Sequence, residues 1–255
     1  MDCDELVSRL DERLRTADYA DLDASPNGLQ VGSGRGTVDR VALAVDAAVA
    51  TIDAAADEDA DLLVAHHGLI WDGLERITDR AYDRIAALVD ADLDLYVSHL
   101  PLDGHRELGN GAQLADLLGL TDREPFGELG PEYVGQRGRL PEPCDRREVV
   151  SSLDEQLPTG GRDVQLLDHG PATIEDVAIV TGSGSDWLDE AVAVDADLLL
   201  TGEGKQQVYH RAREAGVNVA LAGHYATETG GVRAIGSLLE EWGLETTFVD
   251  HPTGL

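Results

Sequence analysis

Residues 41–68 read VALAVDAAVATIDAAADEDADLLVAHHG, and this stretch gives the clearest indication of the fold class. Two apolar runs, 41–45 and 62–65, flank an alanine-rich segment at 47–57. Short apolar runs with polar boundaries are typical of buried strands, and an alanine-rich segment between them favours a helix. The stretch therefore predicts a strand–helix–strand unit of an α/β protein, and it ends on two adjacent histidines.

The same unit occurs a second time in the chain. Residues 177–204 align with 41–68 without a gap, and ten of the 28 positions are identical. The helical pattern at 5–14 likewise returns at 148–157. Chance similarity between segments rich in alanine, aspartate and leucine is the alternative. We expect an internal duplication that gives two α/β domains, each with a largely parallel sheet.

Residues 121–145 interrupt the alternation of strands and helices. Four prolines and four glycines fall within this segment and break its periodicity. We place the domain junction near 120–130 and expect domains at 1–122 and 123–255. The alternation then resumes with a helix at 146–157. No low-complexity linker lies between the halves, so we expect them to pack together.

The composition is strongly acidic. The chain has 31 Asp and 19 Glu against 18 Arg and one Lys, which gives a net charge of −31. These charges are spread along the sequence, as is typical of a salt-adapted surface. An acidic face for a basic partner is the alternative. Direct binding to nucleic acid is not expected, because no basic patch is visible.

The cysteines and the N-terminus bear on the compartment. Cys3 and Cys144 are the only cysteines and belong to no C-x-x-C motif, so neither a disulfide framework nor a zinc ribbon is implied. The N-terminus is acidic and lacks the pattern of a signal peptide. No apolar run approaches the ~18 residues of a membrane helix. We expect a soluble cytoplasmic protein that does not contact membranes.

Histidines and carboxylates follow several of the predicted strands. A His-x-x-x-acid motif occurs twice, and each copy follows an apolar run. Because ligands of open α/β sheets bind outside the carboxyl ends of strands, we expect these side chains to converge. Neighbouring residues of a strand point to opposite faces, so adjacent histidines converge only if their strand has ended. The residues are His66 and His67, the pairs His99/Asp103 and His224/Glu228, and Glu203.

This set of residue types points to metal chemistry. Three histidines and two carboxylates exceed what one tetrahedral zinc with an open position needs. They suit two divalent metals about 3.5–4 Å apart with a bridging carboxylate. The absence of thiolates leaves zinc, iron, manganese or nickel. Each cluster alone is also compatible with ordinary surface or core histidines.

Several motifs, in this order, resemble one known family. They are PNGLQV at 26–31, HHG at 66–68 with Trp71, the segment from His99 through Asp103 to His105, ELGN at 107–110, TGE at 201–203, and the segment from Gly223-His224 to Thr227-Glu228. Together they resemble the Nif-three-like proteins, also called GTP cyclohydrolase I type-two homologues. The resemblance runs nearly end to end. It is closest to the short form, which lacks an inserted middle domain.

The resemblance implies an architecture and a set of site residues. It implies two similar three-layer α/β domains with a dinuclear metal centre between them, assembled into hexameric rings. His99 would lie near the metals as a proton carrier, and Glu228 would bridge them. Carried over by motif, the metal ligands are His66, His67, Asp103, His224 and Glu228.

Two functions follow from this interpretation. The first is a dinuclear metal-dependent hydrolase that acts on a nucleotide or purine ring, as a GTP cyclohydrolase does, through a metal-bound hydroxide. His99 or Glu203 would then shuttle the proton. The alternative is a non-catalytic protein for metal binding, metal delivery or scaffolding. The presence of His99 and Glu203 beside an apparently complete ligand set favours the hydrolase.

Overall fold

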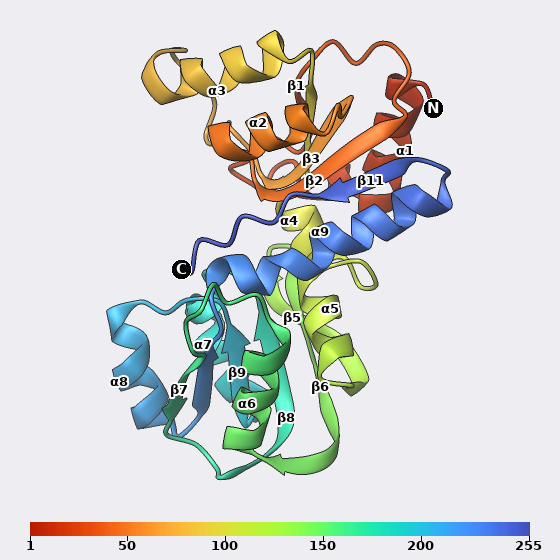
Figure 1. Cartoon of the computed structure of the whole chain (residues 1–255). Coiled ribbons are helices and arrows are strands. Elements are labelled where there is room, and N and C mark those ends of the chain that lie inside the picture. The colour runs from red at the N-terminus through yellow and green to blue at the C-terminus, as the bar shows by residue number, and fades with distance from the viewer. The chain divides into compact units, whose positions relative to one another are not determined.

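The computed structural model describes residues 1–255, which form two compact units (Figure 1). The first unit comprises Met1–Leu102 and Val232–His251, and the second comprises Asp103–Gly231 and Pro252–Leu255. This division differs from the expected domains at 1–122 and 123–255. Helix α9 (His224–Glu241) begins among residues of the second unit and ends among residues of the first.

The first unit has a five-stranded sheet in the order β1-β4-β3-β2-β11. β1 pairs antiparallel with β4, and all the other pairings are parallel. The terminal apolar run of the sequence forms the edge strand β11 beside β2. The strands are β1 (Gly28–Val31), β2 (Arg40–Asp46), β3 (Leu62–His67), β4 (Asp94–Val97) and β11 (Glu245–Phe248).

Helices cover both faces of this sheet. Apolar side chains of α2 (Val49–Asp57) and α3 (Asp79–Asp90) pack against one face and form a continuous core with it. On the other face lie α1 (Cys3–Leu14), the short helix η1 (Thr16–Tyr19) and the later part of α9. The first unit is therefore a three-layer α/β structure whose buried strands are apolar on both sides.

The second unit has a six-stranded sheet in the order β5-β6-β8-β9-β10-β7. Strands β8, β9 and β10 run parallel, whereas the pairings β5–β6, β6–β8 and β10–β7 are antiparallel. The prediction of a largely parallel sheet is therefore wrong for this unit, which is mixed. The strands are β5 (Thr121–Leu129), β6 (Glu132–Asp145), β7 (Gln165–Asp168), β8 (Thr173–Val180), β9 (Leu198–Thr201) and β10 (Asn218–Leu221).

The segment rich in proline and glycine is the β5–β6 hairpin of this sheet. Gly127 and Gly130 have positive φ angles of 78° and 62° near its turn, a conformation that favours glycine. Pro141 and Pro143 lie where the pairing of β6 with β8 shifts register. Proline has no N–H to donate to a ladder, so it is tolerated at such an irregularity. These residues mark a bulged hairpin within the sheet.

Helices also flank the second sheet. The apolar core under one face includes residues of α5 (Asn110–Leu117) and α6 (Arg146–Gln156). The other face is covered by η2 (Gly184–Trp187), α7 (Leu188–Ala193) and α8 (Gln206–Ala215), as Figure 1 shows for α8. None of the helices in the structure combines the length and the apolar character of a membrane span.

The repeated strand–helix–strand unit has the same local structure in both units. Asp61 Oδ2 accepts hydrogen bonds from the backbone N–H groups of Asp39 and Arg40. Asp197 Oδ2 accepts the two corresponding bonds in the second unit, at the same offset as in the sequence alignment. The registers of β2 with β3 and of β8 with β9 agree at that offset too. The identities between the two stretches therefore include residues that make equivalent contacts.

Candidate metal centre

The first unit brings three histidines together at the ends of β3 and β4. His66 and His67 are the last two residues of β3, and His99 follows β4 after Ser98. One ring nitrogen from each histidine lies within 4.8 Å of the others. The sequence argument required the strand to end before the two histidines. In the structure β3 continues through both of them, to His67. Its pairing with β4 does end at Ala65, and beyond that point His67 pairs with Asp46 of β2.

Each of these imidazoles has a hydrogen-bond acceptor at Nδ1. The acceptor is the carbonyl oxygen of Ser98 for His66, at 2.9 Å, and a carboxylate oxygen of Asp46 for His67, at 2.9 Å. For His99 it is a carboxylate oxygen of Asp23, at 2.8 Å. Such an acceptor holds the proton on Nδ1 and leaves the lone pair on Nε2. This arrangement is typical of histidines that ligate metals.

The second unit holds Asp103 rigidly. Asp103 lies in the short helix α4 (Leu100–Gly104) and is buried. The Thr181 hydroxyl and the Asn110 side-chain amide each donate to its Oδ1 at 2.9 Å. The Asn110 carbonyl oxygen in turn accepts from the backbone N–H of Gly231. These bonds fix the carboxylate and explain why Asn110 belongs to the quoted ELGN motif.

The other ligand candidates of this unit lie in the first turns of α9. His224 Nε2 lies 3.2 Å from Glu228 Oε1, and its Nδ1 lies 3.1 Å from Glu203 Oε1. Glu228 is buried, and one of its oxygens lies within 4.8 Å of one of Asp103. The second unit therefore gathers one imidazole and two buried carboxylates, with Glu203 as a more exposed partner.

The pKa values in this unit indicate a site that accommodates positive charge. Burial lowers the pKa of His224, but the carboxylates of Glu228 and Glu203 outweigh burial and raise it to about 9. The Ser183 hydroxyl lowers the pKa of Glu203, burial opposes this, and His224 lowers it further. In the metal-free protein a proton on His224 supplies the positive charge, and a metal would displace it.

Gly182 leaves room for this group of side chains. A Cβ at this position would lie 2.2 Å from Glu228 Oε1 and 3.0 Å from His224 Nε2. Its φ of +55° is in addition a conformation that side chains rarely adopt. The space beside the ligand candidates thus depends on a glycine. Imidazole nitrogens and carboxylate oxygens without thiolate suit a divalent metal of the borderline class, so the residues present fit such an ion.

Replacing Gly182 by alanine is expected to weaken metal binding by about tenfold or more, in the range found when residues around metal ligands are changed. The added methyl group displaces Glu228 and His224. The measurement is the metal dissociation constant by calorimetry. The matched control is Gly216→Ala, because Gly216 also has a positive φ but a Cβ there meets no atom within 4 Å. Equal affinities in the two variants would contradict the role given to Gly182.

The seven site residues expected from the sequence divide between the units. His66, His67 and His99 lie in the first unit, and Asp103, Glu203, His224 and Glu228 lie in the second. Asp103 was expected in the first domain together with His66, His67 and His99, but it belongs to the second unit. Sequence reasoning missed four residues whose side chains hold these groups in place. The missed residues are Asp23, Asp46, Thr181 and Ser183.

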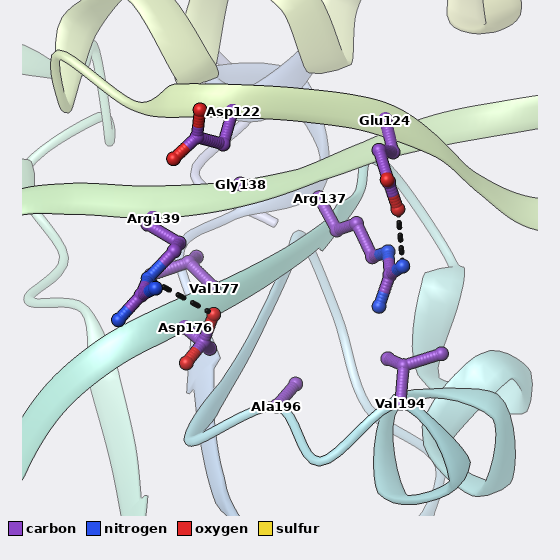
Figure 2. Close-up of a pocket in the computed structure, with 9 residues that line it drawn as sticks. All are labelled: Asp122, Glu124, Arg137, Gly138, Arg139, Asp176, Val177, Val194 and Ala196. Carbon is purple, nitrogen blue, oxygen red and sulfur yellow. Dashed lines mark hydrogen bonds and ion pairs between the residues drawn. The ribbon is translucent and has the colours of Figure 1, made fainter.

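A separate cavity of about 290 Å³ lies in the second unit (Figure 2). Figure 2 shows Arg137 and Arg139 extending into it from β6. Arg137 pairs with Glu124, and Arg139 Nε lies 3.7 Å from a carboxylate oxygen of Asp176. Both guanidinium groups are thus balanced by carboxylates. None of the seven site residues lines this cavity, so it is not the metal centre.

Known proteins similar to this chain match it over its full length. A family model described as Duf34/NIF3 (NGG1p interacting factor 3) matches residues 1–253. A Halobacterium salinarum protein named GTP cyclohydrolase 1 type 2 homolog is 59% identical and covers 100% of both chains. A Pyrococcus abyssi protein of the same name is 43% identical over 100% of both chains. A crystal structure of a Thermus thermophilus protein matches with a TM-score of 0.90, 42% identity and 100% coverage of both chains.

Proposed function

The chain belongs to the Duf34/NIF3 family, whose model it matches over residues 1–253 without an inserted domain, and we therefore propose that it is a dinuclear metal-dependent hydrolase of a nucleotide or purine ring. One observation carries the proposal. All four imidazoles of the site have an acceptor at Nδ1, either a carboxylate or a backbone carbonyl. An acceptor at Nδ1 is typical of histidines that ligate metals at Nε2.

The two units offer different ligand candidates. The first unit offers imidazoles but no carboxylate ligand, and the second offers two carboxylates and one imidazole. Glu228, the carboxylate that lies close to both Asp103 and His224, is the proposed bridge. The proposed ligands are His66, His67, Asp103, His224 and Glu228, and the metals are two divalent ions of zinc, iron, manganese or nickel.

Charge supports the number of metals. Asp103, Glu203 and Glu228 bring three negative charges together in the second unit, and one protonated histidine, His224, neutralises only one of them. Buried carboxylates without compensating charge are costly. Two divalent cations would neutralise the three carboxylates and leave a net positive site, which would favour an anionic substrate such as a nucleotide.

The remaining side chains have roles that need no further ligand. When bound, the metals would act as Lewis acids and lower the pKa of coordinated water. His99 would accept a proton at Nε2, since its Nδ1 is already bonded to Asp23. Glu203 holds His224 at Nδ1 and is half exposed, so it could exchange a proton with solvent. Trp71 meets the His99 ring edge-on at 4.9 Å and is partly exposed, as a side chain that stacks on a purine must be.

Metal analysis tests the proposal first. We expect about two metals per chain by elemental analysis of protein purified in high salt, and fewer in Asp103→Ala. The matched control is Asp116→Ala, which removes an exposed carboxylate of α5 that pairs with Arg123. A metal-free native chain, even after reconstitution, would refute the proposal. A nucleotide-hydrolysis screen of the metal-loaded protein then separates the hydrolase from the non-catalytic alternative, which predicts bound metal without turnover.

A further inference from the structure

Residues 23–27 hold His99 at its backbone and at its ring. The backbone N–H of His99 donates to Asn27 Oδ1 at 2.7 Å, and that of Leu100 donates to Asp23 Oδ2 at 3.0 Å. The ring is held by the bond between Nδ1 and Asp23 Oδ1 at 2.8 Å. Asp23 is 76 residues from His99 in sequence, so the tertiary fold alone brings it there.

Asp23 is saturated with hydrogen-bond donors. Its Oδ1 accepts from the Ser25 backbone N–H and from His99, and its Oδ2 accepts from the Asn27 amide and the Leu100 backbone N–H. The side chain is only 1% exposed. Burial alone would raise the pKa of Asp23, but the hydrogen bonds from His99, Asn27 and Ser25 lower it below its usual value. Asp23 is thus a buried, fixed carboxylate with all its acceptor positions used.

The consequence for His99 is a single tautomer. An ionised carboxylate has no proton to donate, so the ring must carry its own proton on Nδ1. The lone pair is then on Nε2, and the ring cannot rotate without breaking the bond to Asp23. The other first-unit histidines have different anchors: a backbone carbonyl for His66, and for His67 the carboxylate of Asp46, which is 39% exposed. Among these three histidines, only His99 has a buried carboxylate as its anchor.

We propose that Asp23 is a positioning residue of the site, which fixes His99 in the Nδ1–H tautomer and directs its Nε2 lone pair toward His66 and His67. This deepens the proposed function, because it gives His99 the form that a proton acceptor at Nε2 requires. It also assigns a purpose to the PNGLQV motif, since Asn27 orients both Asp23 and the backbone of His99.

The first experiment uses the native chain. Nitrogen-15 NMR of the histidine side chains distinguishes a protonated from an unprotonated ring nitrogen. In both metal-free and zinc-loaded protein, we expect the neutral His99 ring to show a protonated Nδ1 and an unprotonated Nε2. A resonance pattern with the proton on Nε2 would overturn the proposal, and this result needs no variant.

The second experiment replaces Asp23 by asparagine. Asparagine has one oxygen acceptor and an NH₂ group, and all four partners of Asp23 are donors. Three of these partners cannot become acceptors: the two backbone N–H groups, and the Asn27 amide, whose orientation is fixed by its bond to the His99 backbone. The His99 ring can become an acceptor at Nδ1 if its proton moves to Nε2. We therefore expect the Nδ1 resonance of His99 to move from the protonated to the unprotonated range in Asp23→Asn.

Two controls separate positioning from a general loss of structure. Asp46→Asn should change the tautomer of His67 and leave that of His99 as it is in the native chain. Asp11→Asn removes the negative charge of the side chain that accepts from the Tyr96 hydroxyl in the same unit, and it should change neither tautomer. An unchanged His99 tautomer in a folded Asp23→Asn variant would mean that Asp23 only anchors its loop. These NMR measurements require no turnover. The positioning role of Asp23 and the proposed hydrolase activity are therefore tested independently, and either can be refuted while the other holds.

Discussion

Replacing Glu228 by glutamine is expected to reduce the bound metal from about two ions per chain to fewer than one, without unfolding the protein. Glutamine has the shape of glutamate but no charge, and its amide nitrogen cannot ligate a metal. Glu228 is buried beside both Asp103 and His224, so its loss affects both proposed metals. The measurement is elemental analysis with circular dichroism on the same sample. Glu241→Gln, an exposed position at the end of the same helix, is the matched control.

The same substitution has a second consequence that does not depend on metal. In the metal-free chain His224 has a pKa of about 9 against a usual 6.5, and the bond with Glu228 is the largest cause that raises it. A raised folded-state pKa contributes stability that is fully present below pH 6.5 and is lost as the pH rises to about 9. We expect Glu228→Gln to lower the His224 pKa and to flatten this dependence. An unchanged pKa by NMR titration would contradict the geometry of this pair.

Lowering the salt concentration is expected to lower the thermal midpoint of unfolding by about 10 °C or more. The chain carries a net charge of −31, and these charges repel one another in the folded state. The Debye length is about 10 Å at 0.1 M salt and about 3 Å at 1 M, so the repulsion is largely screened only at high salt. The measurement is a set of thermal unfolding curves in KCl, from about 0.1 M to about 3 M.

A charge variant shows whether screening causes this effect. Asp53, Asp57 and Glu58 are exposed residues at or next to helix α2. Neutralising them as Asp53→Asn, Asp57→Asn and Glu58→Gln is expected to raise the midpoint at the lowest salt concentration and to leave it unchanged at the highest. An increase of equal size at both concentrations would point to helix propensity or packing in place of charge repulsion.

Local elements were largely predictable because their signals are local. The apolar runs at 41–45 and 62–65 correspond to β2 and β3, and the pattern at 146–157 corresponds to α6 (Arg146–Gln156). A buried strand must be apolar whatever surrounds it, so its composition reveals it. The gapless alignment also holds in three dimensions, where Asp61 and Asp197 make equivalent bonds.

Long-range organisation was less predictable. Residues 121–145 form a hairpin within the second sheet, although their prolines and glycines suggested a junction. Proline and glycine mark both linkers and bulged strands, and only the pairing partners distinguish the two. The assignment of residues 232–251 to the first unit is likewise invisible locally, because helix α9 continues across that boundary without a break.

The amino-acid sequence alone shows which side chains are available for metal chemistry: the four histidines and the carboxylates that follow strand ends. How each of them is held depends on the tertiary structure. The acceptors at Nδ1 of His67, His99 and His224 come from residues 21, 76 and 21 positions away, and sheet register and loop packing bring them into place. A hydrogen bond requires two atoms within about 3 Å, and distance along the chain does not encode that proximity. For this reason Asp23, the best-held carboxylate beside the site, had no signal of its own in the sequence.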